Sequence, residues 1–479
     1  MRVSLLLFLL VSTSTAAAVP NPLSAPACIH DTTPPPQRIL IVDKDQCGGK
    51  IYCTIQAAVN AAGPGTAVRI RQASTPYNEA VRVTSSGTVG QPLVIEAAPD
   101  HHPILTGGTQ APQFYGALSV QDADHVVVRN LTFDGFNQPS AANAIVVRAQ
   151  ERSPTNIVIS HNTIRNWIWR DPLTGERLDY GERQAGIFFL RSWPQNLRES
   201  VARCNTLDHV AGAGIKINGT GALIEYNTIT NMQCGWYSNK SARKKNVTYA
   251  VAFDVTNTSG NGKGPGGANE QGHYPDLVIR NNLSNGIAGC PFPSTFHYSG
   301  GFWCDVGAAG GQFTDNVILN AVGGGAEGGA GVHIESRCHN WRVANNLVIL
   351  STPLPYAAAY RARKTDGTMF ENNIACGGDV AFWVLGEKGN TVTIRGNTVY
   401  GVRRRLLGGK GDREVTINGT PLTQNFLDNT MEDRVFTTAN MSRSHADCPE
   451  TGAPQGPSLD APALGRETQP ELPHAPAMP

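Results

Sequence analysis

One phrase recurs through the middle of the chain and restricts its fold more than any other feature. Each copy has alternating apolar residues, two polar residues, an Asn and the start of another strand, as in NIVISHNTI from residue 156 and WRVANNLV from residue 341. The Asn positions are Asn162, Asn205, Asn227, Asn282, Asn316, Asn346, Asn373 and Asn397, with Leu131 in the equivalent place of an earlier copy. Short strands with period-two alternation, repeated roughly every 22 to 30 residues with some insertions, predict an all-β fold, a β-solenoid.

The repeated Asn has a structural explanation. Asn tolerates the left-handed helical backbone, and its side chain can hydrogen-bond backbone groups of the neighbouring coil. We therefore expect a ladder of Asn side chains at one turn of the solenoid and assign no catalysis to these residues.

The two ends of the chain differ from its middle. Residues 1–18 combine Arg2, an apolar run from Leu5 to Val11 and small residues up to Ala18, which are the three parts of a secretory signal peptide. Nothing later in the chain is long and apolar enough to cross a bilayer, so no membrane anchor is expected. The Pro-rich segment 19–37 and the Pro- and Ala-rich tail 449–479 are predicted to be disordered or linker-like. The solenoid would then occupy residues 38–448.

Charge and cysteine content indicate the compartment and exclude one class of partner. The chain has 39 basic and 38 acidic side chains, and its basic residues form no long patch, so nucleic-acid binding is not expected. Ten cysteines in a chain with a secretory signal predict disulfides and a secreted protein. Cys47 with Cys53 is the most plausible local pair, and Cys290 with Cys304 is the next.

A second strand recurs between the Asn phrases and often begins with Gly or Ala. With that residue as position zero, positions one and three are apolar, as in Ile215 and Ile217, and are expected to fill the interior. Positions two and four then face outward. Position two includes Lys216, Trp303, His333 and Tyr360, and position four includes Asp254, Asp305 and Glu335 on consecutive coils.

The three carboxylates at position four suggest a site. Stacked strands lie ~4.8 Å apart, so adjacent carboxylates repel unless they form a catalytic pair or hold a hard cation such as Ca²⁺. We consider Asp254 and Asp305 as ligands of this ion. The alternative is a solvated acidic face without a site.

The neighbouring side chains favour the site. Lys216 and His333 are candidate catalytic bases beside Asp305 and Glu335. Aromatic and basic residues complete the set: Trp303 and Tyr360 offer flat surfaces for sugar rings, and Arg361 and Arg363 could clamp a carboxylate of the substrate.

The solenoid pattern of residues 38 to 400 resembles the right-handed parallel β-helix proteins of the pectate lyase-like superfamily. CTIQAAVNAAGPGTAVRI (53–70) and the segment 77–107 look like the capping helix and first coils of polysaccharide lyases in that group. The spacing of apolar residues itself predicts a helix from Thr54 to Ala62, before Gly63 and Pro64. The pair of patterns G-x-W-x-D and G-x-x-x-E, at Gly301 and Gly331, resembles those of carbohydrate-processing members. No complete signature of a polygalacturonase or a pectate lyase is present.

Three functions remain open from the sequence. The first is a polysaccharide lyase that cleaves a uronate-containing polymer by β-elimination, with Lys216 or His333 as the base. The second is a glycoside hydrolase that uses Asp305 and Glu335. The third is a non-catalytic glycan-binding or structural solenoid. The lyase is slightly preferred because the resemblance of the N-terminal cap implies it, and the expected partner is an acidic polysaccharide bound by a monomer.

Overall fold

The computed structural model describes Cys28 and residues 33–422, apart from 108–115, 136–142, 168–184, 193–194, 219–220, 234, 239–245, 258–271, 274–275, 288–295, 306, 322–328, 336, 351–356, 386–389, 403, 409–413 and 418–419. The expected signal peptide (1–18), the expected tail (449–479) and most of the Pro-rich segment lie outside these residues. Among the described residues, no helix has the length and apolar character of a membrane span.

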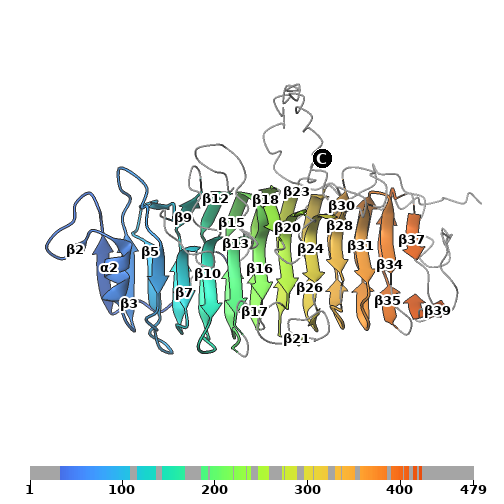
Figure 1. Cartoon of the computed structure of the whole chain (residues 1–479), viewed down its shortest axis with the longest axis horizontal. Helices are drawn as coiled ribbons and strands as arrows, with labels where there is room; N and C mark the ends of the chain where they lie inside the picture. Colours follow the sequence, from blue (N-terminus) through green and yellow to red (C-terminus); the bar gives the residue numbers. More distant parts are fainter. Residues whose placement is uncertain are drawn as a thin grey trace, which may run out of the picture. The chain divides into compact units, whose positions relative to one another are not determined.

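The described strands form three long sheets that run side by side along the solenoid (Figure 1). Sheet A contains, in spatial order, β2 (Ile51–Tyr52), β1 (Arg38–Val42), β3 (Thr66–Ile70), β5 (Leu93–Ala97), β8 (Val126–Arg129), β11 (Ile157–Ser160), β14 (Ser200–Arg203), β17 (Ala222–Glu225), β22 (Val278–Arg280), β26 (Gln312–Thr314), β29 (Arg342–Ala344), β32 (Thr368–Glu371), β35 (Thr391–Arg395), β38 (Glu414–Ile417) and β39 (Thr420–Leu422).

Sheet B begins after the Asn turn of each coil. It contains β36 (Thr398–Tyr400), β33 (Ile374–Gly377), β30 (Leu347–Leu350), β27 (Val317–Ala321), β23 (Leu283–Ile287), β18 (Thr228–Met232), β15 (Thr206–Val210), β12 (Thr163–Trp167), β9 (Thr132–Asp134) and β6 (Ile104–Leu105).

Sheet C completes each coil. It contains β37 (Arg404–Gly408), β34 (Val380–Leu385), β31 (Ala358–Arg363), β28 (Ala330–Ile334), β24 (Phe296–Asp305), β20 (Asn246–Thr256), β16 (Gly212–Asn218), β13 (Ala185–Arg191), β10 (Asn143–Ala149), β7 (Gly116–Gln121) and β4 (Val81–Val83), with β19 (Gly235–Ser238) antiparallel to β20. A short parallel pair joins β21 (Gly272–His273) and β25 (Ala308–Ala309).

Parallel pairing between successive coils confirms the predicted parallel β-helix. The chain passes from sheet A to sheet B to sheet C and then starts the next coil, as in β8, β9 and β10. Parallel strands of one sheet are joined by right-handed crossovers, which is the winding that the resemblance implied.

Side chains that alternate inward along the strands fill the solenoid. Phe302 of sheet C stacks on Phe313 of sheet A with ring centroids 4.4 Å apart, and both are fully buried. Burial of a large apolar side chain contributes about 1.5–3 kcal/mol, and each coil repeats it. The interior therefore holds the three sheets at a fixed spacing and gives their outer faces a rigid support.

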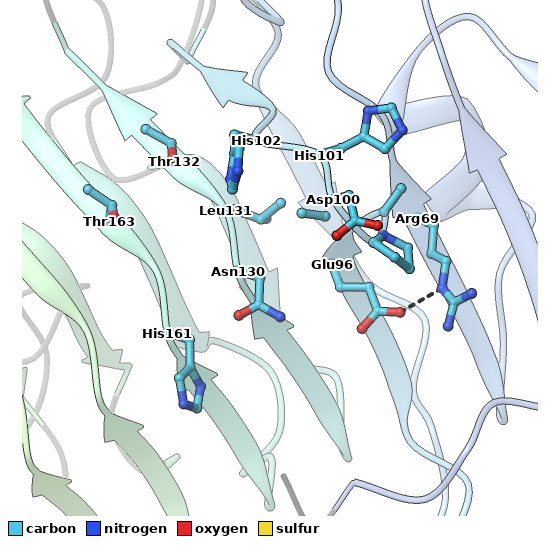
Figure 2. A pocket seen from close by; sticks show the side chains of 13 residues that line it. Arg69, Glu96, Asp100, His101, His102, Asn130, Leu131, Thr132, His161 and Thr163 are labelled. Carbon is cyan, nitrogen blue, oxygen red and sulfur yellow. Dashed lines mark hydrogen bonds and ion pairs between the residues drawn. The ribbon is translucent and has the colours of Figure 1, made fainter. Parts of the chain in front are cut away.

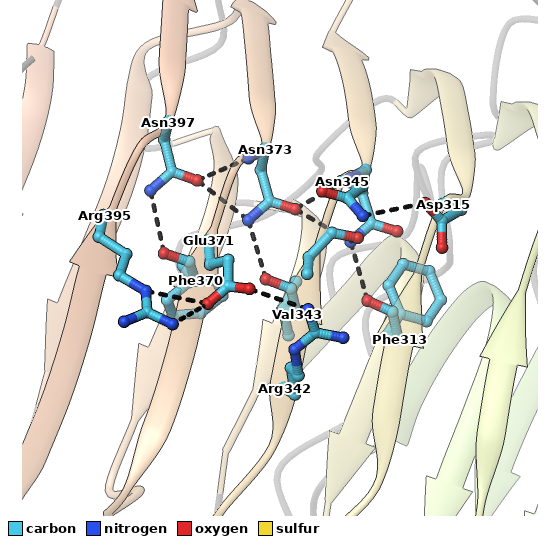
Figure 3. A network of polar contacts seen from close by, with 12 residues as sticks. Phe313, Asp315, Arg342, Val343, Asn345, Phe370, Glu371, Asn373, Arg395 and Asn397 are labelled. Carbon is cyan, nitrogen blue, oxygen red and sulfur yellow. Dashed lines mark hydrogen bonds and ion pairs between the residues drawn. The ribbon is translucent and has the colours of Figure 1, made fainter. Parts of the chain in front are cut away.

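The predicted Asn ladder is present (Figure 3). The backbone N–H of Asn282 donates to Oδ1 of Asn316 at 3.0 Å, and its side-chain Nδ2 donates to the carbonyl oxygen of Ile224 at 3.0 Å. The same pattern links all eight predicted residues, and the Leu131 N–H donates to Oδ1 of Asn162. One detail of the prediction was wrong, because the left-handed backbone belongs to the residue before each Asn, such as His161 and Asn281. The Asn itself is then free to aim its amide at the next coil.

A short helix, α2 (Ile55–Asn60), packs against β1, β3 and β4 beside the first coils. It lies inside the predicted range of Thr54 to Ala62. Thr54 is its N-cap and accepts a hydrogen bond from the Ala57 N–H at 3.2 Å. The buried face contains Ile55, Ala58 and Val59, as the apolar spacing predicted.

The disulfides confirm one predicted pair and correct the other. Cys47 is bonded to Cys53. Cys304 is bonded to Cys338 and not to Cys290, because the Cys304 side chain points into the solenoid and meets a buried turn of the next coil. A third disulfide joins Cys28 to Cys204, which lie 176 residues apart in the sequence.

Candidate functional site

The candidate site lies on the outer face of sheet C and consists of two rows of side chains. The first row contains Lys216, Asp254, Trp303, His333, Arg361 and Trp383 on successive strands from β16 to β34. The second row contains Thr256, Asp305, Glu335 and Arg363. The Glu335 N–H donates to the Cys304 carbonyl at 3.0 Å, which continues the pairing of β24 with β28 and sets Glu335 beside Asp305.

The register of β20 corrects the predicted column of three carboxylates. Asp254 pairs with Lys216 on one side and with Trp303 on the other, so it belongs to the first row, and Thr256 pairs with Asp305. The sequence counted β20 from Ala250, whereas Ala252 is the residue equivalent to Gly301. A two-residue shift keeps the outward orientation but moves Asp254 to a different row.

Tyr360 was placed on the wrong face. It pairs with Val332, points into the interior and is fully buried, with its ring stacked on Phe382 at 5.1 Å. Its hydroxyl lies 2.9 Å from the Asn346 carbonyl oxygen. The sequence counted β31 from Ala358 instead of Ala359, and a one-residue shift reverses every side chain of a strand. A Tyr in this position cannot stack on a sugar.

Lys216 and Asp254 form a buried ion pair in the first row. The Lys216 Nζ donates to Oδ2 of Asp254 at 2.7 Å, and both side chains are almost completely excluded from solvent. The ammonium also lies 5.6 Å from the ring centroid of Phe188. A lysine whose Nζ already donates to a carboxylate in a buried position is poorly placed to take a proton from a substrate.

His333 lies near the end of β28, and Glu335 follows this strand two residues later, so that their side chains come into contact. The His333 Nε2 lies 3.1 Å from Oε2 of Glu335, and Nη1 of Arg363 lies 3.7 Å from the same oxygen. The Arg361 guanidinium stacks over the Trp383 ring at 4.3 Å. The structure therefore brings together an imidazole, a carboxylate and two guanidinium groups that the sequence had proposed separately.

Burial and these neighbours set the protonation states. Burial lowers the pKa of His333 below its ordinary value of 6.5, an effect that Arg361 reinforces and Glu335 opposes. Burial by itself would raise the pKa of Glu335, but His333, Arg363 and Arg361 outweigh it and lower the pKa below the ordinary 4.5. Near neutral pH the pair is therefore a neutral imidazole beside a carboxylate.

Trp303 stands in the first row between Asp254 and His333. It is 5% exposed and belongs to an apolar cluster outside the solenoid interior that includes Phe188 and Tyr249, whose ring centroid lies 6.4 Å away. A cavity of about 10 Å³ beside Trp303 and His333 has room for about one water molecule. The Arg363 side chain is 32% exposed, and Asp305 is partly exposed, so these two residues form the accessible part of the second row, whereas Thr256 and Glu335 are buried.

The predicted calcium ligands do not fit a shared ion. Asp254 is engaged by Lys216, and it lies in a different row from Asp305. Across the described ranges, no group of three or more His, Cys, Asp or Glu side chains is arranged to hold a metal.

Sequence reasoning missed one member of the site. Trp383 was seen only as part of a strand, and its pairing with Arg361 depends on the register of β31 with β34. The signal for Trp383 was available, because it stands at position two when Ala381 is taken as position zero.

Comparisons with known proteins find only distant similarity, and only to solved structures. The sequence matches no protein-family model and no curated protein. Among solved structures, an alginate lyase from Paenibacillus sp. str. FPU-7 is 13% identical, with 78% of this chain and 99% of that chain covered and a TM-score of 0.43.

An exopolygalacturonase from Thermotoga maritima is 10% identical, with 82% and 94% covered and a TM-score of 0.44. PfbA, a surface adhesin of Streptococcus pneumoniae, is 13% identical, with 75% and 85% covered and a TM-score of 0.45. At these identities and TM-scores, the likeness carries no argument about the activity of this chain, whose fold rests on its own strand pairing.

Proposed function

We propose that the protein is a secreted polysaccharide lyase that cleaves a uronate-containing polymer at the outer face of sheet C. The observation that supports this most is the contact of His333 with Glu335 beside two guanidinium groups. The disulfides support secretion, because such bonds persist in oxidising compartments.

His333 is the proposed base. Its lowered pKa keeps the imidazole neutral near pH 7, and Glu335 stabilises the imidazolium that forms when a proton is taken up. The proton comes from the carbon next to the uronate carboxylate. Its electron pair forms the new C=C bond while the glycosidic C–O bond breaks, and the leaving oxygen takes a proton from solvent.

Arg363 is the proposed carboxylate-binding residue. Its side chain lies 3.7 Å from Glu335 and is 32% exposed, so its guanidinium reaches the solvent side of the site, where a substrate carboxylate can approach it. A guanidinium there also stabilises the charge that develops on the carboxylate during proton removal. Because His333 is buried, contact with a saccharide requires neighbouring side chains to move.

The hydrolase alternative is less well supported. A glycosidase needs one carboxyl group that stays protonated near the working pH. The lowered pKa of Glu335 leaves it only the role of base or nucleophile, and Asp305 would have to be the acid. A binding solenoid would use the same face without any turnover.

The test is parallel measurement of ultraviolet absorbance from unsaturated uronate products and of new reducing ends, on pectate, alginate, glucuronan and glycosaminoglycans, with calcium or with a chelator. We expect both signals to grow together. His333→Ala should lower kcat by about 10²–10⁴-fold, and Arg363→Ala should lower kcat/KM. His209→Ala is the matched control, because His209 also contacts an Asp but lies on sheet B.

Each other outcome selects a different function. Reducing ends without absorbance would assign Asp305 and Glu335 to hydrolysis. Binding without either signal would identify a glycan-binding solenoid. Loss of activity with the chelator would show a metal requirement that the described carboxylates do not explain.

A further inference from the structure

A second cavity lies at the turns that join sheet A to sheet B. Its lining residues are distant in the sequence from those of the sheet C site. Its volume is about 450 Å³, within the usual range for ligand pockets. It arises from a difference in turn length. Six residues separate β5 from β6, whereas two residues separate β8 from β9 and β11 from β12. The longer turn forms one wall, and the two short turns form the other (Figure 2).

The short turns that line the cavity are rigid. Asn130 and His161 occupy the left-handed region with φ of 57°, and the residue that follows each of them belongs to the Asn ladder. Thr132 and Thr163 begin the strands that follow and pair with each other. The backbone of this wall is therefore fixed by the coil pairing before any ligand arrives, which reduces the entropy cost of binding.

The histidines of the cavity have defined hydrogen-bonding roles. The His101 Nδ1 accepts a hydrogen bond from the Gln72 N–H at 3.1 Å, so its Nε2 carries the proton in the neutral ring. The His161 Nε2 lies 2.8 Å from the Cys28 carbonyl oxygen, which can only accept, so its Nδ1 is the acceptor in the neutral ring. Together with His102, Asn130 and the two Thr hydroxyls, the lining offers both donors and acceptors.

Charge restricts the ligand class. Arg69 in the lining is paired with Glu96 at 2.9 Å, and the further charged residue in the described lining is Asp100. The arginine and carboxylates of the described lining therefore supply no excess of positive charge for an anionic sugar. A metal is also unsupported by the described side chains, which contain no suitable group of ligands.

We propose that this cavity binds one or two units of a neutral saccharide. Hydroxyl groups of a sugar act as both donors and acceptors, which matches the lining, and the exposed Pro99 supplies apolar surface for a ring face. The proposal is independent of the chemistry at sheet C.

The test is calorimetric titration of the full chain at pH 7 with maltose, lactose and cellobiose, beside galacturonate, glucuronate and Zn²⁺. We expect at least one neutral disaccharide to bind. Thr163→Trp should weaken that binding at least tenfold by filling the cavity. Thr228→Trp is the matched control, because Thr228 has the same position on sheet B two coils away and lies outside the described lining. His102→Ala gives a second variant should Thr163→Trp lower the Tm.

Four results would overturn the proposal. The first is that none of the three disaccharides binds, and the second is that the uronates bind in preference to them. The third is that Zn²⁺ binds and that its binding depends on His102. The fourth is that disaccharide binding is unchanged in Thr163→Trp and His102→Ala but lost in Arg363→Ala. The last result would assign the sugar to the sheet C site.

Discussion

The Lys216 and Asp254 side chains are the most completely buried charges of the candidate site. Removing one member of a buried pair leaves the other charge without its main compensation, so Lys216→Ala should lower the free energy of unfolding by about 3–5 kcal/mol. The double variant Lys216→Met with Asp254→Leu should recover most of this loss. Urea unfolding measures both. A single variant with nearly unchanged stability but no lyase activity would contradict this structural role and make Lys216 the base.

The His333 and Glu335 pair makes stability depend on pH. Both pKa values are lowered in the folded chain, so the unfolded chain binds more protons on acidification. The contribution of His333 is complete above pH 6.5 and is lost as pH falls towards its folded pKa, and that of Glu335 is lost below pH 4.5. We expect the Tm of the unaltered protein to fall between pH 6.5 and 4. The Tm of the double variant His333→Gln with Glu335→Gln should fall less over the same range. An equal fall in both proteins would refute the assignment.

At the scale of one turn, the Asn ladder holds neighbouring coils together. Asn282→Ala removes the acceptor of the Asn227 N–H and Nδ2 groups, at 2.9 and 3.0 Å, in a buried position. A buried donor left without a partner, here the Asn227 N–H, costs about 1–3 kcal/mol. The variant also loses the hydrogen bonds from Asn282 Nδ2 to the Ile224 and Arg280 carbonyls, so it should lose at least about 2 kcal/mol of unfolding free energy. Asn285→Ala, three residues later in β23, is the control, because its hydrogen bond with Asn320 is exposed. Equal losses of unfolding free energy in the two variants would show that the buried ladder contributes no more than an exposed hydrogen bond.

At the scale of the solenoid, the Cys28 to Cys204 disulfide closes a loop of 176 residues, whereas Cys47 to Cys53 closes one of 6. In the chain-entropy description, the longer loop stabilises by roughly 3 kcal/mol more. Replacing Cys28 and Cys204 by Ala should therefore lower Tm more than replacing Cys47 and Cys53. Thermal unfolding followed by circular dichroism compares the two variants, and the opposite order would show that local strain or packing dominates over loop closure.

The sequence by itself determined the solenoid, its coil boundaries and the Asn ladder, because each depends on a local period that repeats in every coil. It also named His333, Glu335, Arg361 and Arg363 as candidate site residues. The tertiary structure decided which residues share a row. In a run of small residues such as Ala358 and Ala359, either residue fits position zero of the sequence pattern, and only pairing with the neighbouring coil shows which one holds that position. For the same reason the interior position of Tyr360, the Lys216 and Asp254 pair and the 450 Å³ cavity depend on contacts between residues far apart in the chain.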